Sequence, residues 1–305
     1  FFELKNLPAL PFTLSTGATK TFDVEVSDAE TSGAVSAQLT IDHDGDDDGT
    51  ATRQLSLSAD QVTNPNWGGG SDYEGYHWAN STSFADDAPS QPSFNWIDIS
   101  SSGTDLMGDL NADDGVAGPY SLSIPFRFFG QDVSEYYIDS NGWISFASSA
   151  PSSEYSNESI PSDYAPNHLI AWFWTDLDPT ESAVTGTHVY QHTTTIDGQS
   201  VHVLTFERMP IHGASADEWI TAQLLLYPSP GPSTNSDIKL QYKEHGSGLA
   251  LDEATVGIEN ADGSEGLEYR YDDTGGPLFG SPLALQIGPT STALPVELTR
   301  FHAAQ

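Results

Sequence analysis

Apolar and polar residues alternate with a period of two along most of the chain. The alternation is regular at 21–28 (TFDVEVSD), 34–44 (AVSAQLTIDHD) and 51–60 (ATRQLSLSAD), between turn-forming breaks. This pattern is typical of half-buried antiparallel β-strands. The sequence contains no convincing amphipathic helix, so the first part of the chain is predicted to be all-β.

Further short strands are predicted at turn-separated intervals. They lie at 120–130, 136–148, 168–178, 186–196, 200–210, 219–229, 236–246, 254–262 and 267–273. Many short strands between turns are typical of a β-sandwich or barrel. A stretch rich in Gly and Asn at 63–72 marks the expected boundary between two modules. We therefore predict modules at 1–62 and 73–290, with the linker 63–72 between them and a C-terminal linker at 291–305.

Aromatic residues divide into two predicted groups. In HLIAWFWTDLD (168–178) both alternating faces are bulky, which predicts a strand buried on both sides. Trp96, Trp143, Trp172 and Trp174 lie in strand-like patterns and are predicted to pack in the core, with Trp78 and Trp96 fixing adjacent strands. Around the Gly-rich linker, three rings are predicted to be available for a ligand such as a sugar: Trp67, Tyr73 and Tyr76.

The charge balance excludes several classes of partner. Nine Lys and Arg residues stand against 44 Asp and Glu residues, giving a formal charge of -35. Such a chain repels nucleic acids and anionic lipid headgroups. No apolar stretch approaches the ~18 residues of a membrane span. We expect no nucleic-acid partner and no membrane insertion, and the acidic surface predicts a salt-tolerant source.

Acidic loops suggest calcium as the only cofactor to consider. Asp44, Asp46 and Asp48 precede Gly49 in the order of an EF-hand loop, but its twelfth position is Leu55 instead of Glu. An acidic hairpin turn is therefore favoured over a calcium site there. A second candidate set, again within an expected hairpin loop, comprises Asp109, Asn111, Asp113 and Asp114. A third pair, Asp176 and Asp178, is expected to cap its loop.

Catalytic motifs are not evident. The sequence has no cysteine, so it has neither a disulfide nor a thiol nucleophile, and it lacks the H-E-x-x-H, G-x-S-x-G and phosphate-loop patterns. The pair His188 and His192 is ~13 Å apart on an extended strand, which is too far for one zinc ion. We expect a protein that is not an enzyme.

Residues 7–60 resemble the later half of the immunoglobulin-like repeats of large bacterial surface proteins. The resemblance rests on a TFDVEV strand followed by a hairpin. It implies an N-terminally incomplete immunoglobulin-like sandwich, whose leading strands would lie before Phe1 or come from another segment. An incomplete sandwich has an open sheet edge that can accept a strand.

Residues 71–289 resemble a nidogen-like β-sandwich module of bacterial secreted proteins. The matching phrases include FNWIDISSSGT, IPFRFFG, YYIDSNGWISF, NHLIAWFWTDLDP and ATVGIENADGSEGLEY. The closing phrase LPVELTRFHAAQ (294–305) resembles the linker before the C-terminal sorting region of the Bacteroidetes-type secretion pathway. Together these resemblances imply export to the cell surface or the medium.

The expected function is that of a non-enzymatic, exported surface protein with a structural or adhesive role. Its expected partners are copies of itself or neighbouring surface modules, with which it would assemble into a filament through strand or head-to-tail contacts. Two alternatives stay open. The chain can be an accessory module of a secreted enzyme such as a protease, or a carbohydrate-binding module that uses the loop from Trp67 to Trp78. Fold alone does not separate them.

Overall fold

The computed structural model describes residues 76–81, 92–232, 234–276 and 282–289 together with the backbone of five further strands at 2–5, 23–26, 33–42, 52–61 and 67–68. Contacts divide the chain into two compact units. Unit 1 comprises 1–64 and 291–305, and unit 2 comprises 65–290. Each unit is described by itself below.

Unit 1 contains two antiparallel strand pairs. Strand β1 (Phe2–Lys5) pairs with β2 (Asp23–Val26), and β3 (Gly33–Asp42) pairs with β4 (Thr52–Gln61). The second pair runs in continuous register from Gly33 opposite Gln61 to Asp42 opposite Thr52. The strands predicted from the alternation in 21–28, 34–44 and 51–60 are therefore confirmed.

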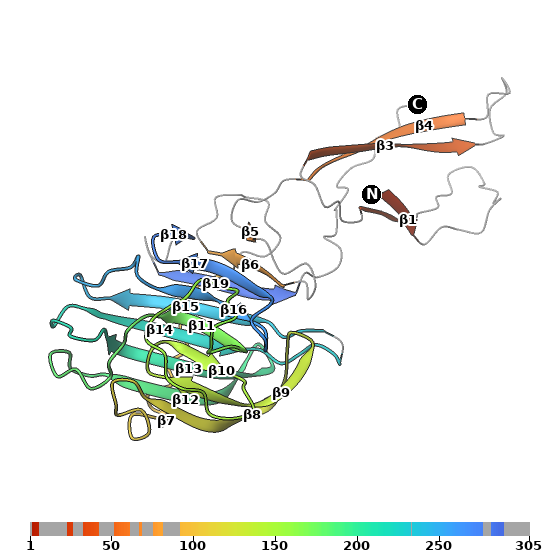
Figure 1. The fold of residues 1–305 in the computed structure, drawn as a ribbon. Helices are drawn as coiled ribbons and strands as arrows, with labels where there is room; N and C mark the ends of the chain where they lie inside the picture. The colour runs from red at the N-terminus through yellow and green to blue at the C-terminus, as the bar shows by residue number, and fades with distance from the viewer. Residues whose placement is uncertain are drawn as a thin grey trace. The chain divides into compact units, whose positions relative to one another are not determined.

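Unit 2 is built from two antiparallel sheets (Figure 1). The seven-stranded sheet has the order β18 (Thr274–Gly275), β17 (Gly266–Tyr271), β16 (Thr255–Glu259), β11 (Leu169–Trp174), β10 (Trp143–Ser145), β9 (Gln131–Asp139) and β8 (Val116–Phe128). The eight-stranded sheet has the order β5 (Trp67–Gly68), β6 (Tyr76–Asn80), β19 (Leu283–Pro289), β15 (Ile238–His245), β14 (Trp219–Leu226), β13 (Gln199–Pro210), β12 (His188–Ile196) and β7 (Thr104–Asp105).

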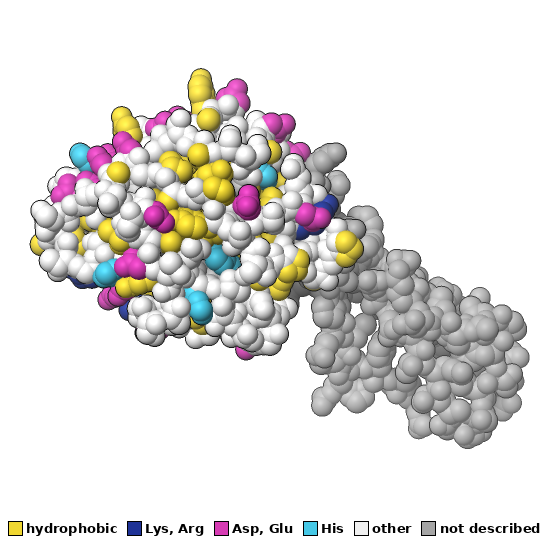
Figure 2. Space-filling view, turned by 90° about the horizontal axis from the view of Figure 1, so that it is seen from below, with side chains coloured by type: hydrophobic (Ala, Val, Ile, Leu, Met, Phe, Trp, Pro, Cys, Tyr) yellow, Lys and Arg dark blue, Asp and Glu magenta, His cyan; other side chains and the backbone are white. Residues whose placement is uncertain are grey.

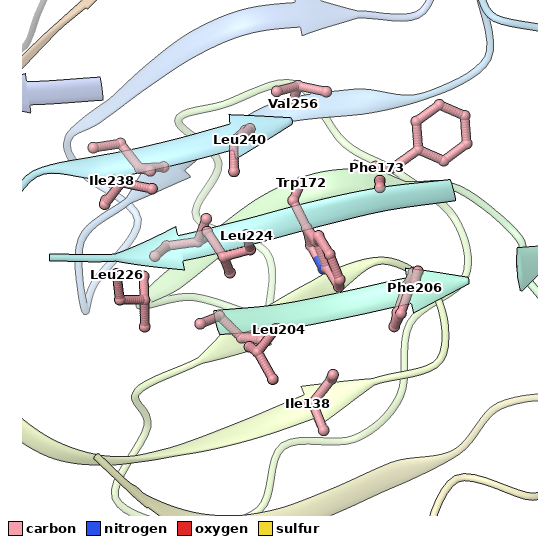
Figure 3. Packing of buried hydrophobic residues seen from close by; sticks show 14 of the residues in the cluster. Ile138, Trp172, Phe173, Leu204, Phe206, Leu224, Leu226, Ile238, Leu240 and Val256 are labelled. Carbon is pink, nitrogen blue, oxygen red and sulfur yellow. The ribbon is translucent and has the colours of Figure 1, made fainter. Parts of the chain in front are cut away.

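The main core lies between the two sheets. Trp172 of β11 is fully buried, and its ring centroid lies 4.2 Å from that of Phe206 on β13. Figure 3 shows Trp172 beside Phe206, with Leu204 and Leu224 close to it. The hydroxyl of Tyr242 on β15 donates to the carbonyl of Trp172 at 2.6 Å, which ties the sheets together across the core. Unit 2 is therefore a β-sandwich, as predicted.

A long loop, residues 147–167, covers the outer face of the seven-stranded sheet. Trp143 and Trp174 point to this face and are buried with Ile160 of the loop. Both indole N–H groups donate to the carbonyl of Glu154, at 3.2 Å from Trp143 and 2.9 Å from Trp174. Strand β11 is buried at every position because one face meets the core and the other meets this loop. The predicted burial of Trp143, Trp172 and Trp174 is confirmed.

The phrase predicted as one strand at 136–148 is divided by a turn. Strand β9 ends at Asp139 and β10 begins at Trp143. Gly142 has a φ of +87°, and its carbonyl accepts hydrogen bonds from the backbone N–H groups of Trp172 and Phe173. A Cβ atom at this position would collide with the carbonyl of Phe173, so the close approach of two backbones requires glycine.

The edge strand β8 is covered along part of its length. The loop that follows β14 pairs with it, because Ser229 N–H donates to the carbonyl of Pro125 and Ser236 N–H donates to that of Arg127, each at 2.8 Å. The Ser123 hydroxyl donates a hydrogen bond of 3.0 Å to the Thr193 hydroxyl, which joins β8 to β12 of the other sheet. The two backbone hydrogen bonds occupy carbonyl groups that an exposed edge would offer to another chain.

On the face of unit 2 that Figure 2 shows, acidic side chains are scattered with few basic ones between them. No helix occurs among the residues that the structure describes. The all-β fold class is therefore confirmed.

Candidate functional site

A row of polar side chains crosses the outer face of the eight-stranded sheet. Gln241 on β15 lies opposite Gln223 on β14, which lies opposite Thr205 on β13. The amide of Gln241 donates to Gln223 Oε1 at 3.2 Å, and the amide of Gln223 donates to Thr205 Oγ1 at 2.8 Å. These three side chains are buried although they point away from the core. They are buried because another segment of the chain covers them.

That segment is residues 92–99, which we call the strap. Gln241 binds Asn95 of the strap twice, accepting from its N–H at 2.6 Å and donating to its carbonyl at 2.8 Å. Gln223 binds Ile97 in the same way, at 3.2 Å and 2.8 Å. Each glutamine amide thus replaces the backbone of a neighbouring strand, and the strap crosses the strands of the sheet instead of joining the ladder.

The strap is fixed at both ends. At its beginning, the Lys239 ammonium donates to the carbonyl of Ser93 at 2.7 Å. At its end, Ile99 is 2 % exposed and packs in a small apolar cluster with Val201, Val203 and Leu225. The strap therefore covers this sheet as the loop 147–167 covers the other.

A pocket of about 110 Å³ lies between the strap and the sheet. The strap contributes Trp96, Asp98 and Ile99, the residue after it contributes Ser100, and the sheet contributes Tyr190, Thr205, Glu207 and Lys243. We call it the strap pocket. Trp96 and Tyr190 are half-buried and give the pocket apolar walls, while most of the other lining side chains can form hydrogen bonds. Aromatic walls combined with polar groups are typical of sites for small ligands.

Charges of both signs surround the strap pocket. The Lys243 ammonium lies 5.4 Å from the centroid of the Trp96 ring and 3.4 Å from a carboxylate oxygen of Glu244. Hydrogen bonds from the hydroxyl and the backbone N–H of Ser100 lower the pKa of Asp98, so that its carboxylate is ionised at neutral pH. Burial, together with nearby carboxylates including those of Glu207 and Asp98, raises the pKa of Tyr190, which therefore remains a neutral hydroxyl.

A second cluster collects carboxylates at the ends of several strands. Asp113 and Asp114 precede β8, Asp176 and Asp178 follow β11, and His212 follows β13. Oxygen atoms of Asp113, Asp114 and Asp176 lie within 4.8 Å of one another, as do ligand atoms of Asp113, Asp178 and His212. Carboxylate oxygens at this spacing are suitable ligands for a hard cation such as calcium.

His212 supplies a positive charge to this acidic cluster when it is protonated. Its Nδ1 atom lies 3.1 Å from an oxygen of Asp113 and 3.8 Å from one of Asp178. The hydrogen bond to Asp113 is the main cause of a raised pKa for His212. Burial raises the pKa of Asp176. A protonated His212 and a bound cation are two ways to balance these carboxylates, and calcium binding stays a prediction.

Asp139 lies next to this cluster and is completely buried. One carboxylate oxygen accepts the backbone N–H of Asn141 at 2.7 Å. The side-chain amide of Asn141 also donates to Asp114 at 3.0 Å. Burial raises the pKa of Asp139 to about 7, against the opposing effect of hydrogen bonding from Ser153 and Asn141, and the Asp114 carboxylate adds a smaller increase.

The structure separates the residues of the predicted calcium loop at 109–115. Asp109 accepts the hydroxyl of Tyr120 at 2.6 Å, and Asn111 is exposed. Asp113 instead faces His212. The expectation that Asp176 and Asp178 cap their loop is supported for Asp178, which accepts hydrogen bonds from Thr180. Their lengths are 2.8 Å from the N–H and 2.6 Å from the hydroxyl. Asp44, Asp46 and Asp48 lie outside the described residues.

The predicted ligand contact at Tyr76 is wrong. Its side chain is fully buried in the core, where its ring lies 5.0 Å from that of Phe129, because β6 is a strand of the sandwich. Trp67 is described by its backbone alone, and Tyr73 lies outside the described residues. Trp78 of β6 packs edge-on against Tyr269 of the other sheet at 4.8 Å, as expected of a residue that fixes strands.

The prediction for Trp96 is also wrong, because this residue lies on the strap and not on a strand. The residues that sequence analysis missed are Tyr190, Glu207 and Lys243 of the strap pocket and His212 of the acidic cluster. One signal was present in the sequence. Gln223 and Gln241 interrupt the apolar runs ITAQLLL and IKLQY, where a buried amide requires a partner.

Comparison with models of known protein families places part of the chain in a family. The model of the family described as "NIDO related" matches residues 88–276, which include the strap, the strap pocket, the acidic cluster and most strands of the sandwich. None of the curated proteins and none of the solved structures compared with the chain matches it. The match extends over more than half of the chain and agrees with the resemblance to nidogen-like modules, so the chain belongs to the NIDO-related family.

Proposed function

We propose that this chain is an exported, non-enzymatic protein of the cell surface with a structural or adhesive role. Support comes first from the family, because NIDO-related domains are typical of extracellular proteins. Within the described residues, no helix is long and apolar enough to cross a membrane. The acidic exterior is compatible with a solvated surface location.

The observation that carries the proposal is that both sheets of unit 2 are covered on their outer faces. The strap is held by Gln223 and Gln241, and the loop 147–167 is held by Trp143 and Trp174. Buried apolar clusters lie beneath both covers. A sandwich with this many fixed layers has few cooperative units that open separately, which suits a module that must persist outside the cell.

Filament assembly is the more specific form of the proposal. Part of the β8 edge is already occupied by Ser229 and Ser236, so strand addition at that edge is disfavoured. The two-stranded pairs β1–β2 and β3–β4 of unit 1 are the better place for strand exchange, because the outer edge of a described strand pair can accept a further strand, and head-to-tail contacts between copies are the alternative.

Labelling of intact cells tests the proposal. Antibodies raised against residues 65–290 are applied to unpermeabilised cells of the source organism, with an antibody against a cytoplasmic protein as the control. We expect surface label, with filaments in cryo-electron micrographs of the sheared surface material. Label that requires permeabilisation contradicts the surface role, whereas surface label without filaments contradicts only the assembly step.

A further inference from the structure

We propose that the strap pocket binds one neutral sugar ring of a glycan. The inference gives the adhesive role proposed above a class of ligand, and it rests on that proposal only for its biological setting. The site differs from the loop between Trp67 and Trp78, where a sugar was expected from the sequence. Its lining residues come from the strap, from Ser100 directly after it, and from β12, β13 and β15.

The apolar part of the pocket suits the ring of a sugar. Trp96 and Tyr190 are half-buried, so each presents some ring surface to solvent at the pocket. Trp96 is held in place by the strap bonds at Asn95 and Ile97 on either side of it. A ring fixed in this way loses little conformational entropy when a ligand contacts it. The C–H groups of a sugar face pack against such rings.

The polar part of the pocket suits hydroxyl groups. Asp98 and Glu207 are acceptors, and Lys243 is a donor. Ser100 and Thr205 add hydroxyls that both donate and accept. A sugar hydroxyl also donates and accepts, so it can bind a carboxylate and an ammonium at once. An apolar ligand would leave these groups without partners and lose free energy.

The charges favour a neutral ligand over a charged one. A cationic ligand would compete with Lys243, whose ammonium already lies near the Trp96 ring and interacts with the Asp98 carboxylate. An anionic sugar such as a sialic or uronic acid would approach a chain of formal charge -35 against repulsion. A neutral hexose avoids both costs.

The test is a titration of the full chain in solution with methyl glycosides of glucose, galactose, mannose and N-acetylglucosamine, followed by saturation-transfer NMR. A glycan array extends the search to longer sugars. We expect at least one neutral glycoside to bind. Trp96→Ala and Glu207→Gln should each weaken that binding about tenfold or more. Glu207→Gln keeps the side-chain volume, so it reports on the pocket even if Trp96→Ala loosens the strap.

Tyr164→Ala provides the matched control, because this aromatic ring is 70 % exposed and lies on the loop 147–167, away from the strap pocket. Its binding should equal that of the wild type. The inference is overturned if no glycoside and no array glycan binds, if both pocket variants bind as well as the wild type, or if the chain prefers acidic sugars or alkylammonium ions. Each of these results leaves the surface location of the protein to be decided separately by cell labelling.

Discussion

Replacing Asp139 with asparagine should stabilise unit 2 at alkaline pH and leave it nearly unchanged at acidic pH. Asp139 is fully buried, and one of its carboxylate oxygens accepts the N–H of Asn141. Asparagine retains an acceptor for the Asn141 N–H and carries no charge. It therefore resembles the protonated form of the carboxyl group.

The magnitude follows from the pKa of Asp139, which burial raises from 3.8 to about 7. Between these two pH values the folded state holds a proton that the unfolded chain has released, so the free energy of unfolding decreases as the pH rises. At 1.36 kcal/mol for each pKa unit, the decrease reaches about 4 kcal/mol above pH 7. Structural relaxation reduces this value, and we expect Asp139→Asn to gain about 2–4 kcal/mol at pH 8.

Urea unfolding followed by tryptophan fluorescence at pH 4 and pH 8, in the same salt, measures the difference. All seven tryptophans lie in 65–290, so the signal reports on unit 2. Asp163→Asn is the control, because Asp163 is exposed and its replacement changes the net charge equally. An equal gain at both pH values, or an equal gain from Asp163→Asn, would refute the reasoning.

Three further predictions concern the turn, the strap and the charge. Gly142→Ala should lower the free energy of unfolding by about 2–4 kcal/mol, because the added Cβ would meet the Phe173 carbonyl at a position with positive φ. Urea unfolding measures this loss, with Gly198→Ala as the control, because a Cβ at Gly198 meets no atom although its φ is also positive. An equally small loss from both variants contradicts the steric reason. Gln223→Leu should lower the free energy of unfolding by about 2–3 kcal/mol and speed proteolysis within 92–99, because the backbone N–H and carbonyl of Ile97 lose their partner. An unchanged rate of proteolysis contradicts this prediction. The midpoint temperature of thermal unfolding should rise with NaCl concentration, because salt screens the repulsion within a chain of charge -35. A constant midpoint counts against the acidic surface as an adaptation to salt.

Local patterns allowed the strands to be predicted from the sequence. The alternation at 34–44 and 51–60 is a property of neighbouring residues, and it correctly indicated the hairpin of β3 and β4. The bulky residues on both faces of 168–178 correctly indicated a strand covered on two sides. In each case the information lies within about ten residues, where side-chain direction follows directly from the backbone.

The strap could not be predicted in this way. Phe94, Trp96 and Asp98 alternate with Asn95 and Ile97 as in a strand, but the partners of this segment are side chains more than 120 residues away. A period of two describes an extended backbone and does not specify what that backbone binds. The same pattern therefore predicts a strand at Trp96, where the structure has the strap.

The acidic cluster combines groups that the sequence presents separately. Asp113 and Asp176 lie in different loops, and each was considered only with its own neighbours. The fold places both loops at the strand ends near His212, so the charge of one loop affects the other. Such a site depends on the order of strands in the sheet, which periodicity does not provide.

The strap has a consequence for how the sandwich bears force. Ladder bonds between β14 and β15 resist shear only as long as the two strands remain in register. The strap crosses both strands, because Asn95 binds Gln241 on one strand and Ile97, two residues further along, binds Gln223 on the other. When a pull slides β14 along β15, the strap is loaded at the same time as the ladder, so the two sets of bonds share the tension. For the surface role proposed above, this means that the strap would raise the force needed to begin unfolding the sheet.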